Sequence, residues 1–130
     1  MSPRTPCLLA LSLLLAIAAP AQTPDEGIVR DFWPSRLGKD VEKLFDFARA
    51  DLDGTGRGDY IVAIYGNSPC VVRVLRAAGG APSLVAEAAP DAMGGHAPRL
   101  RLVDLDGDGR PEIVAAFATI TGGEVTWIFR

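Results

Sequence analysis

The chain is 130 residues long, and its 16 Asp and Glu slightly outnumber its 13 Lys and Arg, which gives a formal net charge of −3. Its arginines are scattered singly, without the basic face or stripe that nucleic acid requires, so nucleic-acid binding is excluded. The length suits one domain with one hydrophobic core. The partners that remain are a small cation, another exported protein or a carbohydrate.

Residues 1–21 have the pattern of a secretory signal peptide. Arg4 supplies the positive n-region, an apolar run extends from Cys7 to Ala19, and Ala19-Pro20-Ala21 offers small residues for signal peptidase. A membrane anchor is the alternative, but a spanning helix needs about 20 apolar residues, and this run stops at Pro20. We predict cleavage after Ala21, a periplasmic or secreted location, and no membrane span in the mature chain.

Residues 22–42 form an N-terminal extension that carries Phe32-Trp33-Pro34. An exposed Trp33 could bind a sugar or a partner, but the pattern favours a tryptophan packed over the end of a sheet. The same interpretation is favoured for Trp127, which lies in an expected strand.

The central feature is an internal repeat, because residues 51–59 recur at 104–112 with an offset of 53. The two segments read Asp-Leu-Asp-Gly-Thr-Gly-Arg-Gly-Asp and Asp-Leu-Asp-Gly-Asp-Gly-Arg-Pro-Glu, which are identical at six of nine positions. An apolar run follows each copy, at 60–64 and at 113–117.

The spacing of the acidic residues predicts two calcium loops. Calcium takes about six to eight oxygen ligands, which a tight loop can supply when carboxylates recur at every second residue. Gly109 allows the sharp bend that brings the later ligands around the ion. The predicted ligands of the second loop are Asp104, Asp106, Asp108, the carbonyl of Arg110, and Glu112.

The first loop offers one carboxylate fewer, because Thr55 stands where the second loop has Asp108. Its predicted ligands are Asp51, Asp53, the hydroxyl of Thr55, the carbonyl of Arg57, and Asp59. Lower ligand charge predicts weaker binding, so we expect calcium to bind more tightly at the second loop. The alternative for both loops is a metal-free Asp/Gly turn in which Asx-turns satisfy the backbone.

An EF-hand begins in the same way but is excluded by its far end. Its loop closes with a bidentate Glu at position twelve and continues into a helix. Here position twelve is Val62 in one copy and Ala115 in the other. The runs that leave the loops are apolar and rich in β-branched residues, which indicates buried strands.

The remaining strands complete two small meanders. The segment 43–49 also fits helical spacing, but the second copy enters its loop through 99–103, which alternates like a strand. If the copies share a structure, Phe45 and Phe47 lie on the same face as Leu100 and Leu102. Further strands are expected at 70–76, 83–87 and 124–129.

Two single residues receive no chemical role. Cys70 is the only cysteine after residue 21, so no intramolecular disulfide can form, and we expect a small buried hydrophobe. His96 is the only histidine and has no Cys or His neighbour with metal-ligand spacing.

The prediction is an all-β fold of two propeller-blade-like antiparallel β-meander repeats, each with an Asp-rich calcium loop between its first two strands. Repeat 1 spans 43–88, a linker loop spans 89–98, and repeat 2 spans 99–130. Together, residues 43–130 are expected to form one compact domain.

The two loops and the strands after them resemble the VCBS and FG-GAP repeats, whose Asp-rich loops bind calcium within β-propeller blades, as in integrin alpha chains. The resemblance implies the ligands named above, although Thr55 and Glu112 depart from the family pattern. Propellers of this family use about seven blades, whereas this chain supplies two. A compact sheet pair is favoured over assembly of copies or pairing with another protein.

The expected function is an exported calcium-binding repeat protein that acts as a structural or ligand-recognition module, not as an enzyme. One alternative is a small exported hydrolase that uses a metal-bound water, but no catalytic constellation is apparent. The other alternative is a purely structural periplasmic protein with degenerate loops.

Overall fold

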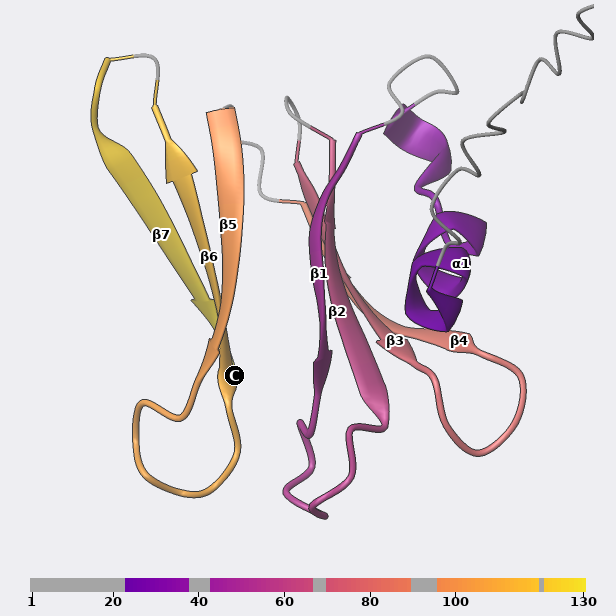
Figure 1. Cartoon of the computed structure of the whole chain (residues 1–130). Helices are drawn as coiled ribbons and strands as arrows, with labels where there is room; N and C mark the ends of the chain where they lie inside the picture. The colour runs from indigo at the N-terminus through magenta and orange to yellow at the C-terminus, as the bar shows by residue number, and fades with distance from the viewer. Residues whose placement is uncertain (1–22, 38–42, 67–69, 90–95, 120) are drawn as a thin grey trace, which may run out of the picture.

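Two antiparallel sheets lie face to face, and a short helix covers the outer face of the first (Figure 1). The computed structural model describes residues 23–37, 43–66, 70–89, 96–119 and 121–130. The predicted signal peptide therefore lies outside the described residues, as do parts of the extension and of the linker. Within the described residues, no helix is both long and apolar enough to cross a membrane.

The strands form two meanders, ordered β1-β2-β3-β4 and β5-β6-β7. This confirms the predicted all-β fold, and observed strand ends lie close to the predicted ones, except that β5 begins three residues earlier than expected. The elements are α1 (Pro24–Asp31), a short 3₁₀ helix η1 (Ser35–Leu37), β1 (Leu44–Ala50), β2 (Tyr60–Tyr65), β3 (Val71–Arg76), β4 (Ser83–Ala88), β5 (His96–Val103), β6 (Glu112–Ala118) and β7 (Glu124–Phe129).

The helix α1 begins with a regular N-cap. The hydroxyl oxygen of Thr23 accepts the backbone N–H of Glu26 at 3.3 Å, and Pro24 opens the first turn, where its missing N–H costs nothing. Val29 is the buried residue of the helix and packs on the first sheet. An Arg73 side chain from β3 donates to the carbonyl oxygen of Phe32, at the end of the helix.

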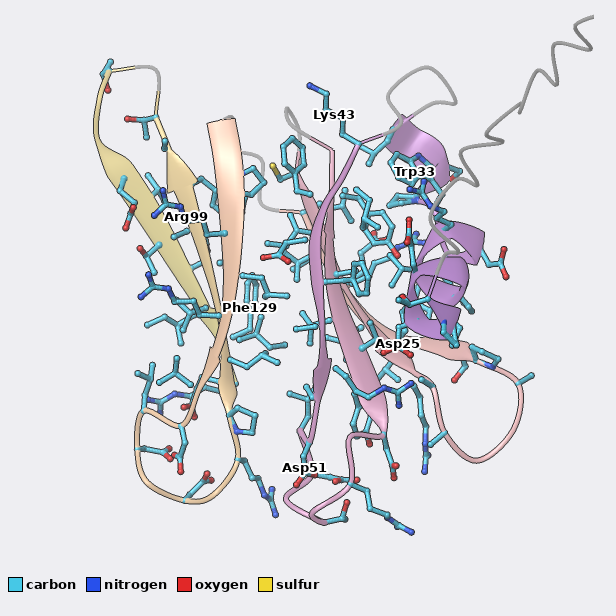
Figure 2. All side chains as sticks on the ribbon, in the orientation of Figure 1. Asp25, Trp33, Lys43, Asp51, Arg99 and Phe129 are labelled. Carbon is cyan, nitrogen blue, oxygen red and sulfur yellow. The ribbon has the colours of Figure 1, made fainter. Side chains whose placement is uncertain are left out.

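The strand β2, inside the first sheet, is buried on both faces, which explains why it is a continuous apolar run. Alternate residues face opposite sides. One side meets the second sheet in a core made by Ala50, Val62, Ile64, Cys70, Val72, Ile113, Ala115 and Phe117. The other side lies under α1 and η1, in a second core made by Val29, Leu37, Ile61, Ala63, Tyr65, Val71 and Leu75. Figure 2 shows Phe129 of β7 between the two sheets.

The prediction that Phe45 and Phe47 share a face is wrong. The register of β1 shifts between Leu44 and Asp46, where a β-bulge or irregularity interrupts pairing with β2. The extra residue breaks the two-residue alternation. As a result Phe45 packs with Leu100 and Leu102 between the sheets, whereas Phe47 packs on the helix side.

Both tryptophans pack on the sheets, as predicted. The ring of Trp33 meets Tyr65, the last residue of β2, edge to face, with centroids 5.4 Å apart and planes at 88°. The Tyr65 hydroxyl donates to the Val29 carbonyl at 2.7 Å, and burial raises the pKa of Tyr65. Trp127 packs against the core between the sheets.

Cys70 is fully buried in the core between the sheets, as predicted. Its thiol lies 3.4 Å from the Gly66 carbonyl oxygen, to which it can donate. Burial raises the pKa of Cys70 to about 11, because the charged thiolate is poorly solvated there.

An ion pair joins α1 to β1, and we predict that it makes stability pH-dependent. Arg49 donates from Nη2 and Nε to the two carboxylate oxygens of Asp25, at 2.5 and 3.0 Å. These hydrogen bonds hold the pKa of Asp25 below its ordinary value of 3.8. Asp25→Asn should lower the free energy of unfolding by about 0.5–1 kcal/mol at neutral pH.

The direction in which stability changes with pH follows from the lowered pKa of Asp25. The contribution of Asp25 is fully present above its ordinary pKa and is lost as the pH falls through the folded value. Urea midpoints of the two proteins should therefore differ at neutral pH and converge in acid. Asp31→Asn, an exposed site at the end of the same helix, is the control. A difference that persists in acid would contradict the assignment.

Candidate metal centre

The two acidic loops lie at the same end of the sheets (Figure 1). Each joins the first two strands of its meander, β1 to β2 and β5 to β6, as predicted. The two loops approach each other closely. A Cβ built at Gly54 of the first loop would lie 3.3 Å from Cγ of Arg110 in the second loop. Gly54 also has a φ of +69°, so any larger residue there would be strained and crowded by the neighbouring loop.

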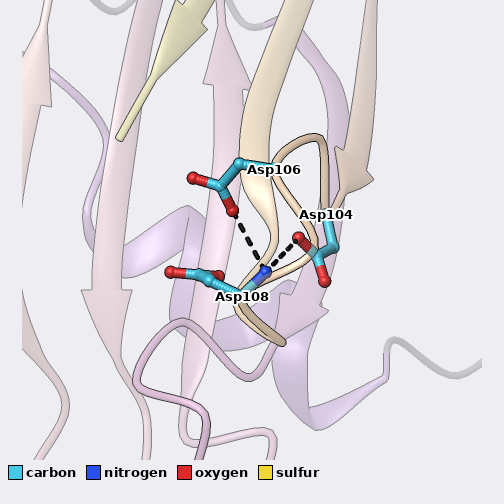
Figure 3. Close-up of side chains that lie close together, drawn as sticks. All are labelled: Asp104, Asp106 and Asp108. Atoms are coloured by element: carbon cyan, nitrogen blue, oxygen red, sulfur yellow. Dashed lines mark hydrogen bonds between the residues drawn. The ribbon is translucent and has the colours of Figure 1, made fainter.

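The second loop brings three carboxylates together. One carboxylate oxygen each from Asp104, Asp106 and Asp108 lies within 4.8 Å of the other two, and all three side chains are exposed (Figure 3). The alternation predicted from the sequence thus converges on a common point. The donors are hard, anionic oxygens, which suit calcium, and solvent access leaves a path for the ion.

Backbone amides organise these carboxylates. Asp104 Oδ1 accepts the N–H groups of Gly107 and Asp108, at 2.7 and 3.1 Å, and Oδ2 accepts that of Gly109 at 2.9 Å. Asp106 and Asp108 accept one amide each, from Asp108 and Arg110. Gly109 has a φ of +85°, which confirms the bend expected there. Asx-type turns therefore shape the loop, and Asp104 is their main acceptor.

Glu112 lies apart from the three aspartates. It is only 6% exposed, and its Oε2 accepts the N–H of Leu105 at 2.7 Å, which ties the end of the loop to its beginning. Among the described residues, the carboxylate oxygens of Glu112 do not belong to the group that lies within 4.8 Å of one another, which comes from the three aspartates alone. Its predicted role as a ligand stays a prediction, beside an observed role in closing the loop.

The first loop is organised around Asp51, Asp53 and Thr55. Asp51 accepts the N–H of Thr55 at 3.0 Å and that of Gly56 at 2.7 Å. Asp53 Oδ1 accepts the Thr55 hydroxyl at 2.8 Å, and this hydrogen bond is the main cause of the lowered pKa of Asp53. The hydroxyl predicted as a ligand is thus a donor to a carboxylate here.

The far end of the first loop is also engaged. The carbonyl oxygen of Arg57 accepts the N–H of Asp59 at 2.9 Å, and the Arg57 side chain lies 3.7 Å from the Asp59 carboxylate. Among the described residues, the carboxylates of this loop form no cluster like that of the second. Calcium ligation by the first loop therefore stays a prediction.

Sequence reasoning missed the contacts made by backbone and by long side chains. The spacing of the acidic residues does not indicate that the Leu105 amide donates to Glu112, because that contact depends on the path of the loop. Nor does it indicate that the aliphatic part of Arg110 lies beside Gly54, because that proximity depends on how the two repeats pack.

Fold and site together define a β-meander repeat protein with paired acidic loops. A family model described as an FG-GAP-like repeat matches residues 51–115, which is half of the chain. The chain belongs to the FG-GAP-like repeat family. Neither the curated proteins nor the solved structures that were searched include a match.

Proposed function

We propose that this chain is an exported calcium-binding protein that serves as a structural or recognition module. The observation that carries the proposal is the convergence of Asp104, Asp106 and Asp108 in a loop of the matched family segment. Three carboxylates so close together repel one another, and a divalent cation at their centre would relieve this repulsion.

A metal-free loop held by Asx-turns is the competing explanation. The amides that Asp104 accepts offset part of its charge, so its loop has a defined shape by itself. Asp106 and Asp108 each accept only one backbone amide within the described residues. They are therefore the carboxylates with the largest capacity left for an ion.

Export is the second element of the proposal. It is supported by the pattern of residues 1–21, where a positive residue, an apolar run and small residues follow in the order of a signal peptide. The partner would be another exported protein or a carbohydrate.

Isothermal titration calorimetry with calcium, and separately with magnesium, tests the proposal. We expect calcium to bind with a dissociation constant of about 10⁻⁴ to 10⁻³ M, the range of extracellular modules. Magnesium should bind more weakly, since it demands near-ideal octahedral geometry and loses water reluctantly. Absence of calcium binding at millimolar concentrations would refute the proposal in favour of the Asx-turn loop.

A further inference from the structure

The strand β7 forms an edge of the second sheet. Val125, Trp127 and Phe129 lie on one of its faces, and Glu124, Thr126 and Ile128 lie on the other. Within the described residues it pairs only with β6, whereas β3, its counterpart in the first sheet, has β4 on its other side. Val125 is 39% and Ile128 is 53% exposed. Edge strands usually carry Lys, Pro or a bulge that blocks further pairing. Residues 124–129 contain no Lys or Pro, and the register with β6 is regular.

The alternation of hydrogen bonds between β6 and β7 shows which backbone groups of β7 point toward its free edge. The amide of Thr119 donates to the carbonyl oxygen of Gly123 at 2.8 Å, at the start of the β6–β7 hairpin. Hydrogen-bonded pairs alternate along an antiparallel ladder. In the observed register, Val125, Trp127 and Phe129 therefore bond to β6. The intervening residues, Glu124, Thr126 and Ile128, direct their N–H and C=O groups away from β6.

We propose that β7 pairs antiparallel with β7 of a second copy, around a two-fold axis at Trp127. In this register Thr126 faces Ile128 of the second copy, and both direct their backbone groups to the shared edge. Val125 faces Phe129 in the same way. An interface of this kind is isologous, so every contact occurs twice.

Charge complementarity selects this register. It places Glu124 opposite Arg130 of the second copy, at both ends of the paired strands. Both side chains are exposed, and no ion pair holds either of them within the described part of the chain. Opposite charges directly across a strand pair stabilise it, and like charges destabilise it. A shift by two residues would lose both pairs.

A cavity lies between the two sheets, bounded by β3 and β4 on one side and by the second acidic loop and the Phe129 end of β7 on the other. It has a volume of about 610 Å³ and is lined at its apolar side by Val72, Val74, Ala86 and Phe129. Residues that oppose each other in a ladder lie on the same face of the sheet. Val125 of the second copy, opposite Phe129, would thus project toward the first sheet at the Phe129 end of this cavity.

Sedimentation velocity over a concentration series tests the pairing. We expect a monomer–dimer equilibrium, and we expect Glu124→Arg or Arg130→Glu to raise the dissociation constant about tenfold, because each places two like-charged pairs in the interface. The double charge swap, Glu124→Arg with Arg130→Glu, should restore the dimer. A protein that stays monomeric at all concentrations, or a double swap that fails to restore dimers weakened by the single changes, would overturn the proposal.

A matched pair of lysine substitutions identifies the edge. Ile128→Lys on β7 should abolish the dimer, whereas Leu84→Lys on the edge strand β4, at a site that is 43% exposed, should leave it intact. The reverse result would place the interface on β4 and overturn the assignment. Far-ultraviolet circular dichroism of every variant, expected to match the parent protein, separates loss of pairing from loss of fold.

Discussion

Asp106→Asn should abolish most of the calcium-induced rise in the thermal unfolding temperature. An ion that binds only the folded state stabilises it by about 1.4 kcal/mol at a tenfold excess over the dissociation constant. For a domain of this size, that corresponds to a rise of about 5 to 10 °C. The asparagine keeps an oxygen that can accept the Asp108 amide, so the change removes charge from the cluster while the loop keeps its shape.

The matching substitution in the first loop is the control. Asp53 occupies the same loop position as Asp106, and Asp53→Asn should remove a smaller part of the calcium effect, because that loop has one carboxylate fewer. Asp104 is a poorer test residue, since it accepts three backbone amides and its loss would disturb the loop even in EDTA. Equal calcium shifts in Asp106→Asn and the parent protein would exclude Asp106 as a ligand.

Phe117→Ala should destabilise the protein by about 3–5 kcal/mol, the cost of a large cavity in a well-packed core. Phe117 is only 2% exposed and belongs to the core between the two sheets. The measurement is equilibrium unfolding in urea, with the free energy of unfolding taken from the midpoint and the slope.

This substitution also tests whether the repeats share one core. We expect one cooperative transition for the parent protein and for Phe117→Ala, because residues of both repeats pack in the same cluster. Leu84→Ala, at an exposed position, should change stability by less than about 0.5 kcal/mol. Two separate transitions, with only one sensitive to Phe117→Ala, would show that the repeats fold independently.

The strands were predictable because their signals are local. The apolar run after each loop extends over only a few residues, and the repeat at an offset of 53 allowed one copy to be compared with the other. The assignment of 43–49 to a strand depended on comparison with the second copy, and the observed β1 confirms it. The bulge near Leu44 left no such signal, because it depends on how β1 pairs with β2.

The helix α1 shows a different limit. Its N-cap Thr23, Pro24 and early acidic residues are recognisable helix-start signals, yet its eight residues are too few to be stable alone. Its stability comes from the first sheet, through buried Val29 and the Asp25–Arg49 pair. Such tertiary support does not appear in a local pattern.

The closeness of three aspartates in the second loop was predictable from the sequence, whereas the closure of that loop was not. Alternating aspartates in the second loop converge as the spacing indicated. Glu112 belongs to the same pattern, but its carboxylate reaches the Leu105 amide, seven residues earlier. Whether the Glu112 carboxylate binds an ion or a backbone amide depends on the path of the loop, which the spacing of the acidic residues alone does not define.

A crystal structure of the protein grown in millimolar calcium tests the central claim most directly. We predict a cation bound by carboxylate oxygens of Asp104, Asp106 and Asp108, at distances of about 2.3 to 2.6 Å. The same three side chains bound only to backbone amides and water, with no ion among them, would contradict it.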